Sequence, residues 1–427
     1  MKPPPFTGGA AVTLRARQVF PVRRPPLEDG AVRVAGGRIE AVGPWVELRR
    51  EAGATRDLGE VALFPGLVNA HCHLDYTDLA GEIPPRRGFT DWIMGMKAAK
   101  DARTLAEIRA AWRAGAEQLS RRGVTTVADA EAFPELLPDL WAETPLRVRS
   151  FLELIRIRAD LDAEEPARRA VDRIRAWPEG RRRAGLSPHA PYSTTPALLS
   201  CCARLAEERE LPLMIHAAES REEFEMFTAA RGPLFEWLRA NGRDMSDCDG
   251  RSPVAHLART GVLGPRTLVV HANYLAPGDA EQLARSGATV VHCPRSHAYF
   301  GHAPFPLAEL RRTGTPVCLG TDSLATVEAR RGVRPELDLR AEMAEFARRF
   351  PDVPPAEILR MATLNGARAL GRAGRAGELT AGAEADLVLV PSSGGPDAVR
   401  ERWVRGALEV GAVLLGGRWV GDREPGP

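Results

Sequence analysis

Eight short apolar runs, separated by amphipathic helical segments, occupy the chain from about Phe64 to about Arg372. A loop follows each run, and in most cases a helical stretch such as EIRAAWRAGAEQL comes next. This alternation predicts an α/β fold with a parallel sheet and crossover helices, and eight such units predict a (β/α)₈ TIM barrel. In chain order the runs are ALFPGLVNA, VTTVAD, RVRSFLEL, RAGLSPHA, PLMIHAAE, TLVVHANY, TVVHCPRS and PVCLGTDS.

Short alternating stretches lie on both sides of these units. Between Thr13 and Val46 they are TLRARQVFPV, GAVRVAGG and RIEAVGP, and after Leu379 they are ADLVLVP, AVLLGG and RWVG. Alternation with turn residues between the stretches is typical of β-hairpins. We therefore expect residues 1–62 and 375–427 to build one small β-sandwich together, with the barrel, residues 63–374, inserted between them.

Composition restricts the class of partner and the compartment. The formal net charge of the 427 residues is only +2, and the many arginines are scattered among acids, which argues against a nucleic-acid or anionic-membrane surface. No apolar run is long enough to cross a bilayer, and the first residues lack the pattern of a secretory signal. The six cysteines form no CxxC pair. We expect a soluble, cytoplasmic protein with a small-molecule partner.

Polar residues follow several of the predicted barrel strands where each strand ends. His71 and His73 follow the first run, and residues two apart in an extended segment face the same way, so both imidazoles can reach one ion. The other candidates are His216 and Glu219 in the fifth run, His271 in the sixth and Asp322 in the eighth. Imidazoles with a carboxylate suit Zn²⁺, with Fe²⁺ or Mn²⁺ as alternatives, whereas unrelated polar residues at strand tips would have no reason to converge.

Three of these motifs carry a resemblance to a known family. PGLVNAHCHLD, the HxxE that begins at His216 and the GTDS that contains Thr321 resemble the amidohydrolase superfamily. The match is closest to the branch that contains cytosine and guanine deaminases, S-adenosylhomocysteine and aminofutalosine deaminases, and triazine chlorohydrolases. ATLNGARALG followed by GELTAGAEADLVLV resembles the return of that family to its β-sandwich. The resemblance implies that the metal ligands are His71, His73, His216 and Asp322, and that Glu219 and His271 are catalytic.

The same residues suit hydrolysis in chemical terms. A bound divalent ion lowers the pKa of a coordinated water to about 7. Asp322 can take the proton of that water and His271 can orient it, which makes Asp322 both ligand and catalytic residue. Glu219 can give a proton to a ring nitrogen and then help to protonate departing ammonia, as a glutamate that is not a ligand does in other zinc deaminases. The simpler interpretation of Glu219 is a solvated acid at a helix start, near Glu222 and Glu223.

The scarcity of lysine bears on the number of metal ions. Binuclear members of the superfamily bridge two ions with a carboxylated lysine on the fourth strand. The fourth run here has no lysine, and none occurs beyond Lys100. A single divalent ion is therefore expected, and Glu153, the nearest alternative bridging residue, is interpreted as a neighbour of the metal site or of the substrate pocket.

Further residues are candidates for contact with substrate. His189 and Tyr192 follow the fourth run, where related deaminases use the histidine to contact substrate, and Ser323 follows Asp322. Trp92 could stack on a heterocycle, although a tryptophan on an apolar helix face more often belongs to the core. His297 stands where the family often has asparagine, so it is a candidate specificity residue. With His292 and His302 it could line a specificity pocket or bind a second ion. We expect His302 and His256 to be ordinary polar loop residues. The resemblance suggests a homodimer.

The sequence favours a deaminase among three interpretations. The first is a metal-dependent hydrolase that releases ammonia from an aminated purine, pyrimidine or related heterocycle or nucleoside, with Glu219 as its distinguishing feature. The second keeps the same site with one metal ion but displaces another group, as a chlorohydrolase or a hydrolase of amidine or amide C–N bonds. The third is a noncatalytic barrel used as a binding module, which commonly loses the ligands that this sequence retains.

Overall fold

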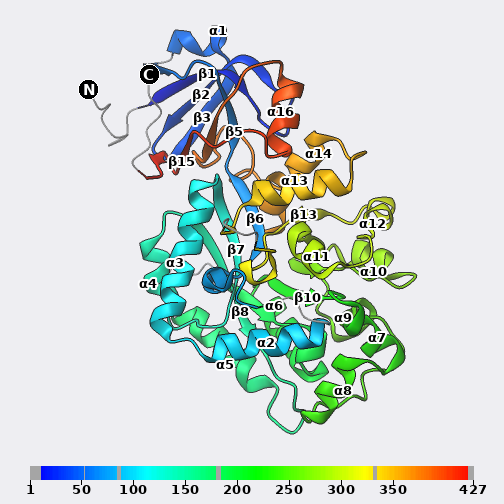
Figure 1. Cartoon of the computed structure of the whole chain (residues 1–427). Helices are drawn as coiled ribbons and strands as arrows, with labels where there is room; N and C mark the ends of the chain where they lie inside the picture. Colours follow the sequence, from blue (N-terminus) through cyan, green and yellow to red (C-terminus); the bar gives the residue numbers. More distant parts are fainter. Residues whose placement is uncertain (1–10, 52, 84–87, 179–183, 330–333, 422–427) are drawn as a thin grey trace.

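The chain forms two sheets in the computed structural model, which describes residues 11–51, 53–83, 88–178, 184–329 and 334–421. One sheet is an eight-stranded parallel barrel and the other is a smaller, mostly antiparallel sheet above it in Figure 1. The predicted TIM barrel with a small β unit built from both ends of the chain is confirmed. The exact division at residues 62 and 374 stays a prediction.

The barrel contains all eight predicted strands in sequence order, and each strand pairs in parallel with the next. Side chains such as Val68, Phe151 and Met214 fill its interior, so the barrel is a packed core and only its carboxyl end is available for chemistry. Its strands are β6 (Leu67–Cys72), β7 (Val124–Glu131), β8 (Arg147–Leu154), β9 (Ala184–Pro188), β10 (Leu213–Ala217), β11 (Thr267–His271), β12 (Thr289–His292) and β13 (Val317–Leu319).

The smaller sheet joins the two ends of the chain. Strand β5 pairs with β1 on one side and, antiparallel, with β14 on the other, so that Leu63 lies opposite Leu389. Figure 1 shows β5 continuing downward into β6 of the barrel. The strands of this sheet are β1 (Val12–Val19), β2 (Leu27–Ala35), β3 (Arg38–Pro44), β4 (Ala54–Asp57), β5 (Val61–Pro65), β14 (Leu387–Pro391), β15 (Ala412–Leu415) and β16 (Arg418–Trp419).

The first apolar run is divided between the two sheets rather than forming one barrel strand. Pro65 ends β5, because proline has no N–H to donate to a sheet ladder. Gly66 then makes the transition: its N–H donates to the carbonyl of Asp386, and a Cβ at this position would lie 2.1 Å from Oγ1 of Thr125. The run therefore connects the sandwich to the barrel.

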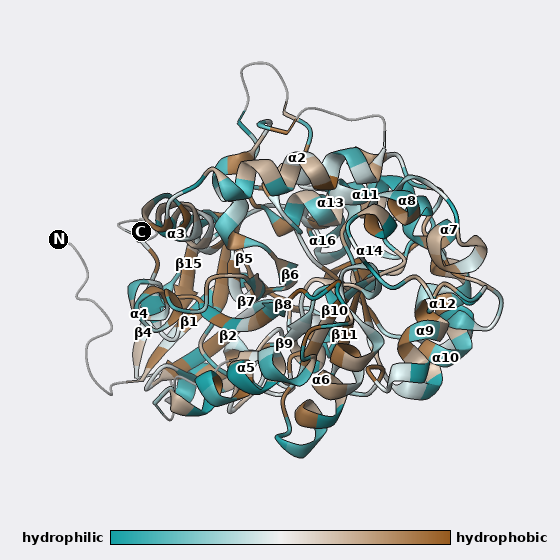
Figure 2. Ribbon diagram, turned by 90° about the horizontal axis from the view of Figure 1, so that it is seen from below, coloured by the Kyte–Doolittle hydropathy of each residue, from teal (hydrophilic) through white to brown (hydrophobic). Residues whose placement is uncertain are grey.

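Helices cover the outside of the barrel with their apolar faces turned inward, and outer helices such as α5 and α10 show teal as well as brown in Figure 2. Helix α3 shows the pattern: Thr104 and Glu107 cap its start in a capping box, and Ile108, Trp112 and Leu119 are buried. None of the described helices is long and apolar enough to span a bilayer. The helices are α1 (Trp45–Leu48), α2 (Phe89–Asp101), α3 (Leu105–Arg121), α4 (Leu137–Glu143), α5 (Glu164–Ala176), α6 (Pro196–Glu208), α7 (Arg221–Ala229), α8 (Pro233–Ala240), α9 (Pro253–Thr260), α10 (Asp279–Ser286), α11 (Pro294–Phe300), α12 (Leu307–Thr313), α13 (Leu339–Arg349), α14 (Pro355–Met361), α15 (Leu364–Ala369) and α16 (Pro396–Val404), with short 3₁₀ turns η1 (Arg49–Glu51), η2 (Leu74–Leu79), η3 (Pro191–Ser193) and η4 (Leu324–Thr326).

The barrel closes between its first and last strands. The N–H groups of Thr321 and Asp322 donate to the carbonyl of His71 at 2.9 and 3.2 Å, and Cys72 forms a parallel bridge with Asp322. Gly320 lies against β6 at this seam, where a Cβ would come within 2.9 Å of both Cβ and the carbonyl oxygen of His71. Closure therefore brings His71 and Asp322 together.

Adding a methyl group at this seam should destabilise the barrel. We expect Gly320→Ala to lower the free energy of unfolding by about 1–3 kcal/mol, because neither backbone can move away without breaking the closing hydrogen bonds. Urea denaturation measures the difference. Gly264→Ala is the matched control, since the nearest atom to a Cβ there is 3.9 Å away. Equal unfolding midpoints for the two variants would contradict this account of the closure.

Candidate active site

Five of the predicted polar residues converge at the carboxyl end of the barrel. Nε2 of His71 lies 3.3 Å from Nε2 of His216, and Oδ1 of Asp322 lies 3.6 Å from Nε2 of His71 and 3.7 Å from Nε2 of His73. Ligand atoms of His71, His216 and His271 also lie within 4.8 Å of one another. Strands β6, β10 and β11 and the loop after β13 supply these side chains, as expected for an active site of this fold.

The donor atoms in this cluster fit a cation. Nδ1 of His216 donates to the carbonyl of His189 at 2.8 Å, so its Nε2 is the unprotonated nitrogen of a neutral ring. Nδ1 of His71 faces the sulfur of Met214 at 3.2 Å, which turns its Nε2 toward Nε2 of His216. Two imidazole nitrogens at this distance need a proton or a cation between them. A divalent metal ion would meet that need, beside the carboxylate of Asp322.

The electrostatics of the cluster agree with that fit. Burial, with His71 beside it, lowers the pKa of His73 to about 3, and burial also lowers the pKa of His271 to about 3. Burial alone would raise the pKa of the Asp322 carboxyl, but hydrogen bonding from His71 and the charge of the surrounding imidazoles hold it well below its ordinary value. The low pKa values of His73 and His271 and the ionised carboxyl of Asp322 suit a divalent ion, because such an ion binds its ligands in their deprotonated forms.

Glu219 lies beside the cluster and is buried rather than solvated. Its Oε1 is 3.5 Å from Nε2 of His271, and only 6% of the residue is exposed. Burial, with the charges of Asp322 and Glu223 nearby, raises the pKa of this carboxyl well above its ordinary value. The site therefore contains one carboxyl that favours its ionised form and a second that favours its protonated form.

Several of these residues lie on backbone in the left-handed region. Positive φ angles occur at Ala218 (51°), His271 (75°), Ala272 (49°) and Asp322 (54°), where residues other than glycine are uncommon. Each lies directly at or after the end of a barrel strand. Such strain concentrates at functional sites because the turn aims the side chain into the site. It has no signal in the sequence.

Comparison with known proteins places this arrangement in a family. The model of the amidohydrolase family matches residues 62–420. The chain belongs to the amidohydrolase family. The resemblance found in the sequence is thereby confirmed, and the chain is identified as an enzyme that hydrolyses carbon–nitrogen bonds.

Curated relatives and solved structures extend the comparison. A 5-methylthioadenosine/S-adenosylhomocysteine deaminase of Syntrophobacter fumaroxidans is 33% identical over 375 residues, 85% of this chain and 80% of the relative. An aminodeoxyfutalosine deaminase of Deinococcus radiodurans is 32% identical over 353 residues, 80% of this chain and 81% of the relative. The crystal structure of an adenosine deaminase from Xanthomonas campestris with bound zinc superposes with a TM-score of 0.82 at 26% identity, covering 96% of this chain and 92% of that one.

Three positioning residues of this amidohydrolase site were not singled out in the sequence. Asn69 donates to Oγ1 of Thr321 at 2.8 Å and accepts from the Thr321 N–H, which joins β6 to the segment before Asp322. Asp129 on β7 accepts from the N–H of Leu74 and from the indole of Trp112, each at 2.9 Å, and so fixes the turn after His73. Asn69 could have been found from its place in PGLVNAH, two residues before His71, on the same face of the strand.

Glu223 is the third of these residues, and neither it nor Glu222 is a solvated acid. The carboxylate of Glu223 accepts from the N–H groups of Ala218 and Glu219, at 3.0 and 2.8 Å, and the side chain is fully buried. Glu222 accepts from the N–H groups of Phe89 and Thr90 at the start of α2, each at 2.9 Å. Glu223 thus holds the turn that carries Glu219, and Glu222 ties α2 to it.

The predicted substrate residues lie at different depths around the cluster. His189 is adjacent, with its ring centroid 4.9 Å from that of His216, and Tyr192 packs edge-on against His189 at 5.7 Å. Ser323 is buried at the start of η4, directly after Asp322. Trp92 on α2 packs against Phe89 and Phe300, so it belongs to an aromatic cluster and also lines a pocket. Whether these side chains contact substrate stays a prediction.

The histidines of the seventh unit and of α9 differ from expectation in part. His297 is buried, its Nε2 donates to the carbonyl of Ala303 at 2.9 Å, and its role in specificity stays a prediction. His292 stacks on Phe305 at 3.9 Å. The prediction of ordinary loop residues was wrong for His256, which is buried on helix α9 against Phe227. His302 lies in a loop, as expected, where it lines a pocket between Tyr274 and Phe300.

That pocket has a volume of about 210 Å³ and begins one residue beyond the catalytic candidates. Ser220 follows Glu219, and Tyr274 follows Asn273, whose side chain donates to the carbonyl of Glu219. The remaining wall is largely aromatic, with Phe89, Trp92, Tyr299, Phe300 and His302 and with Arg221 and Glu222 beside them. The pocket wall therefore includes Ser220 and Tyr274, the residues that directly follow Glu219 and Asn273 in the chain.

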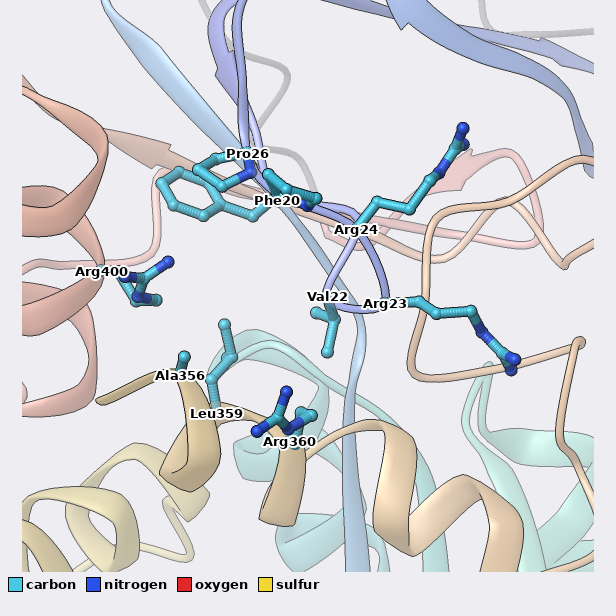
Figure 3. A pocket seen from close by; sticks show the side chains of 10 residues that line it. Phe20, Val22, Arg23, Arg24, Pro26, Ala356, Leu359, Arg360 and Arg400 are labelled. Atoms are coloured by element: carbon cyan, nitrogen blue, oxygen red, sulfur yellow. The ribbon is translucent and has the colours of Figure 1, made fainter. Parts of the chain in front are cut away.

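A larger pocket, of about 270 Å³, lies elsewhere, between the sandwich and helices α14 and α16. Figure 3 shows Arg360 and Arg400 beside it, while the guanidinium of Arg23 points away. Arg23 instead forms a bidentate ion pair with Glu378, at 2.7 and 2.9 Å. Since no carboxyl or imidazole lines this pocket, it offers no acid–base chemistry, and the histidine cluster is the candidate active site.

Proposed function

We propose that this amidohydrolase is a metal-dependent deaminase that removes the ring amino group of an adenosine-like nucleoside bearing a substituent on its sugar. Water replaces the amino group at the ring carbon and ammonia leaves. Support comes from curated relatives whose names state deamination of 5-methylthioadenosine, S-adenosylhomocysteine or aminodeoxyfutalosine. The aromatic pocket supports the substituent, because a free base would leave it unfilled.

The observation that carries this proposal is the placement of two buried carboxyl groups on one site, with Asp322 3.6 Å from Nε2 of His71 and Glu219 3.5 Å from Nε2 of His271. The pKa of Asp322 is depressed by the imidazoles despite its burial, whereas burial raises the pKa of Glu219. Paired acids whose surroundings separate their pKa values in this way mark the base and the acid of a reaction. Asp322 suits removal of a proton from the attacking water, and Glu219 suits protonation of a ring nitrogen.

The remaining residues would hold the metal ion and orient the attacking water. His71, His73, His216 and Asp322 would hold one divalent ion, and we propose Zn²⁺, as in the Xanthomonas campestris structure. Such an ion would acidify the attacking water and offset negative charge on its oxygen. His271, neutral and 3.5 Å from Glu219, can donate to or accept from the attacking oxygen. The absence of lysine from β9 favours one ion over two.

The assembly and compartment belong to the same proposal. The substrate is a small molecule, as in the rest of the family, and we propose a homodimer in the cytoplasm. All six cysteines are free thiols, which suits a reducing compartment.

Ammonia release by the zinc-loaded protein tests the function. We expect turnover of 5′-methylthioadenosine, S-adenosylhomocysteine or another 5′-substituted adenosine, with kcat/KM at least about tenfold above that for adenine, because pocket contacts add binding energy of roughly 1.4 kcal/mol or more. Guanine, cytosine and pterins complete the panel. A chlorinated triazine, assayed for chloride, tests the alternative leaving group. Chloride release without ammonia from any nucleoside would overturn the proposal.

A further inference from the structure

A lysine side chain enters the barrel mouth next to the active site. Lys100 lies near the end of α2, and only 24% of its side chain is exposed. Its Nζ lies 3.6 Å from Oε2 of Glu153 and 5.6 Å from the ring centroids of Tyr76 and Phe133. Lys97, one turn earlier on the same helix, is 67% exposed and pairs only with Asp101. The two lysines therefore have different environments on one helix.

Buried acids surround the Lys100 ammonium. Both carboxylate oxygens of Asp75 are buried without a hydrogen-bond partner, and so is Oε2 of Glu131. Glu153 is 6% exposed at the carboxyl end of β8. Burial opposes a charge on both groups, yet the pairing with Lys100 lowers the pKa of Glu153 to about 2, and the pairing with Glu153 holds the pKa of Lys100 above its ordinary value. Without the ammonium, the buried Glu153 carboxylate would lose the cation that it pairs with.

Two of the residues that Lys100 contacts, Tyr76 and Glu153, lie against histidines in or next to the proposed metal site. The ring of Tyr76 stacks on that of His73, with centroids 5.2 Å apart and planes at 18°. Oε1 of Glu153 faces Nε2 of His189 at 3.9 Å, and the carbonyl of His189 accepts from Nδ1 of His216. One ammonium thus supports the neighbours of two candidate ligands, from outside the cluster itself.

We propose that Lys100 is a positioning residue of the metal site, whose ammonium holds Tyr76 and Glu153 where they orient His73 and His189. Tyr76 restricts the rotation of the His73 ring, and the Lys100 ammonium at 5.6 Å, together with the Arg103 guanidinium at 5.8 Å, fixes the ring of Tyr76. Glu153, held as a carboxylate, keeps the His189 segment in the position from which its carbonyl fixes the tautomer of His216. Such outer contacts orient ligands and contribute about 10- to 100-fold to metal affinity or activity.

Zinc affinity of the full chain tests the proposal without relying on turnover. Competition with a chelator should show Lys100→Met weakening zinc binding by about 10- to 100-fold, while Lys97→Met stays within about twofold of the unchanged protein. Lys100→Arg, which keeps the charge, should recover part of the loss. Equal affinities in Lys100→Met and Lys97→Met would overturn the proposal. Should Lys100→Met not fold, Lys100→Gln replaces it and is judged by the same comparison.

A double-mutant cycle tests whether Lys100 acts through Glu153. If Lys100 acts through that carboxylate, the effects of Lys100→Met and Glu153→Gln on zinc affinity should be strongly non-additive, whereas additive effects would contradict that route. The same cycle measured as kcat/KM for ammonia release rests on the proposed function. A protein that releases ammonia from no substrate would refute the proposed function alone, since zinc affinity still decides the role of Lys100.

Discussion

Glu219→Gln should lower kcat for ammonia release by about 10²- to 10⁴-fold while the protein remains folded and loaded with zinc. Burial favours the protonated form of this carboxyl, and glutamine has the shape of a protonated glutamate, so the hydrogen bonds that Glu223 makes to the turn should survive. The amide cannot deliver a proton to the ring nitrogen or return one to ammonia. Single-turnover ammonia assays of unchanged and variant protein measure the loss.

The matched control is Glu225→Gln, which makes the same chemical change further along the chain, on helix α7. Glu225 is 33% exposed and interacts only weakly, at 3.9 Å with Arg221 and at 4.0 Å with Arg231. It should retain full activity. The metal content of the variant distinguishes a proton donor from a metal ligand at Glu219. The distinction is needed because ligand atoms of Glu219, His271 and Asp322 lie close enough together to hold an ion. Loss of zinc together with activity in Glu219→Gln would make Glu219 a ligand and refute its assignment as a proton donor.

The barrel could be predicted from sequence because its strands are apolar on both sides. Runs such as TLVVHANY are buried throughout as β11, so a continuous apolar segment between helical stretches is a strong local signal. The positions of His71, His216, His271 and Asp322 followed from the same pattern, since parallel strands end at one edge. That edge brings these residues together although they are distant in sequence.

The supporting residues were harder to predict because their roles depend on tertiary contacts. Glu222 and Glu223 have the sequence pattern of acids in the first turn of a helix, which are usually solvated. Here the backbone turns left-handed at Ala218, and the N–H groups exposed by that turn need an acceptor, which Glu223 provides. Lys100 is similar: its helical position is identical in kind to that of Lys97, and only the fold shows which of the two enters the barrel.

The proposed chemistry depends on the protonation states of the Asp322 and Glu219 carboxyl groups as much as on their positions. Asp322 and Glu219 are both buried, but His71, His73 and His271 all act on the Asp322 carboxyl, whereas the charges of Asp322 and Glu223 act on Glu219, so the difference between their protonation states comes from neighbours rather than from exposure. A change that removed the charge of Asp322 would therefore disturb both the metal site and the base at once.

Asp322→Asn should cause the larger loss, because it removes the charge that holds the ion and the base that takes the proton. We expect zinc affinity to fall by more than the roughly 100-fold cost of losing an outer contact, and kcat/KM to fall by at least about 10³-fold. Asparagine tolerates the left-handed backbone at this position, where φ is 54°, so strain does not explain the loss. Metal analysis and ammonia assays measure the two effects.

Asp397→Asn is the control for this substitution, since Asp397 on helix α16 is 90% exposed and lies outside the site. It should bind zinc and release ammonia as the unchanged protein does. Excess zinc separates the two roles of Asp322. If saturation with zinc restored full kcat in Asp322→Asn, the residue would be a ligand without a catalytic role, and another group would have to take the proton. If zinc binding were unchanged while activity was lost, the three histidines would hold the ion alone and Asp322 would act only as the base.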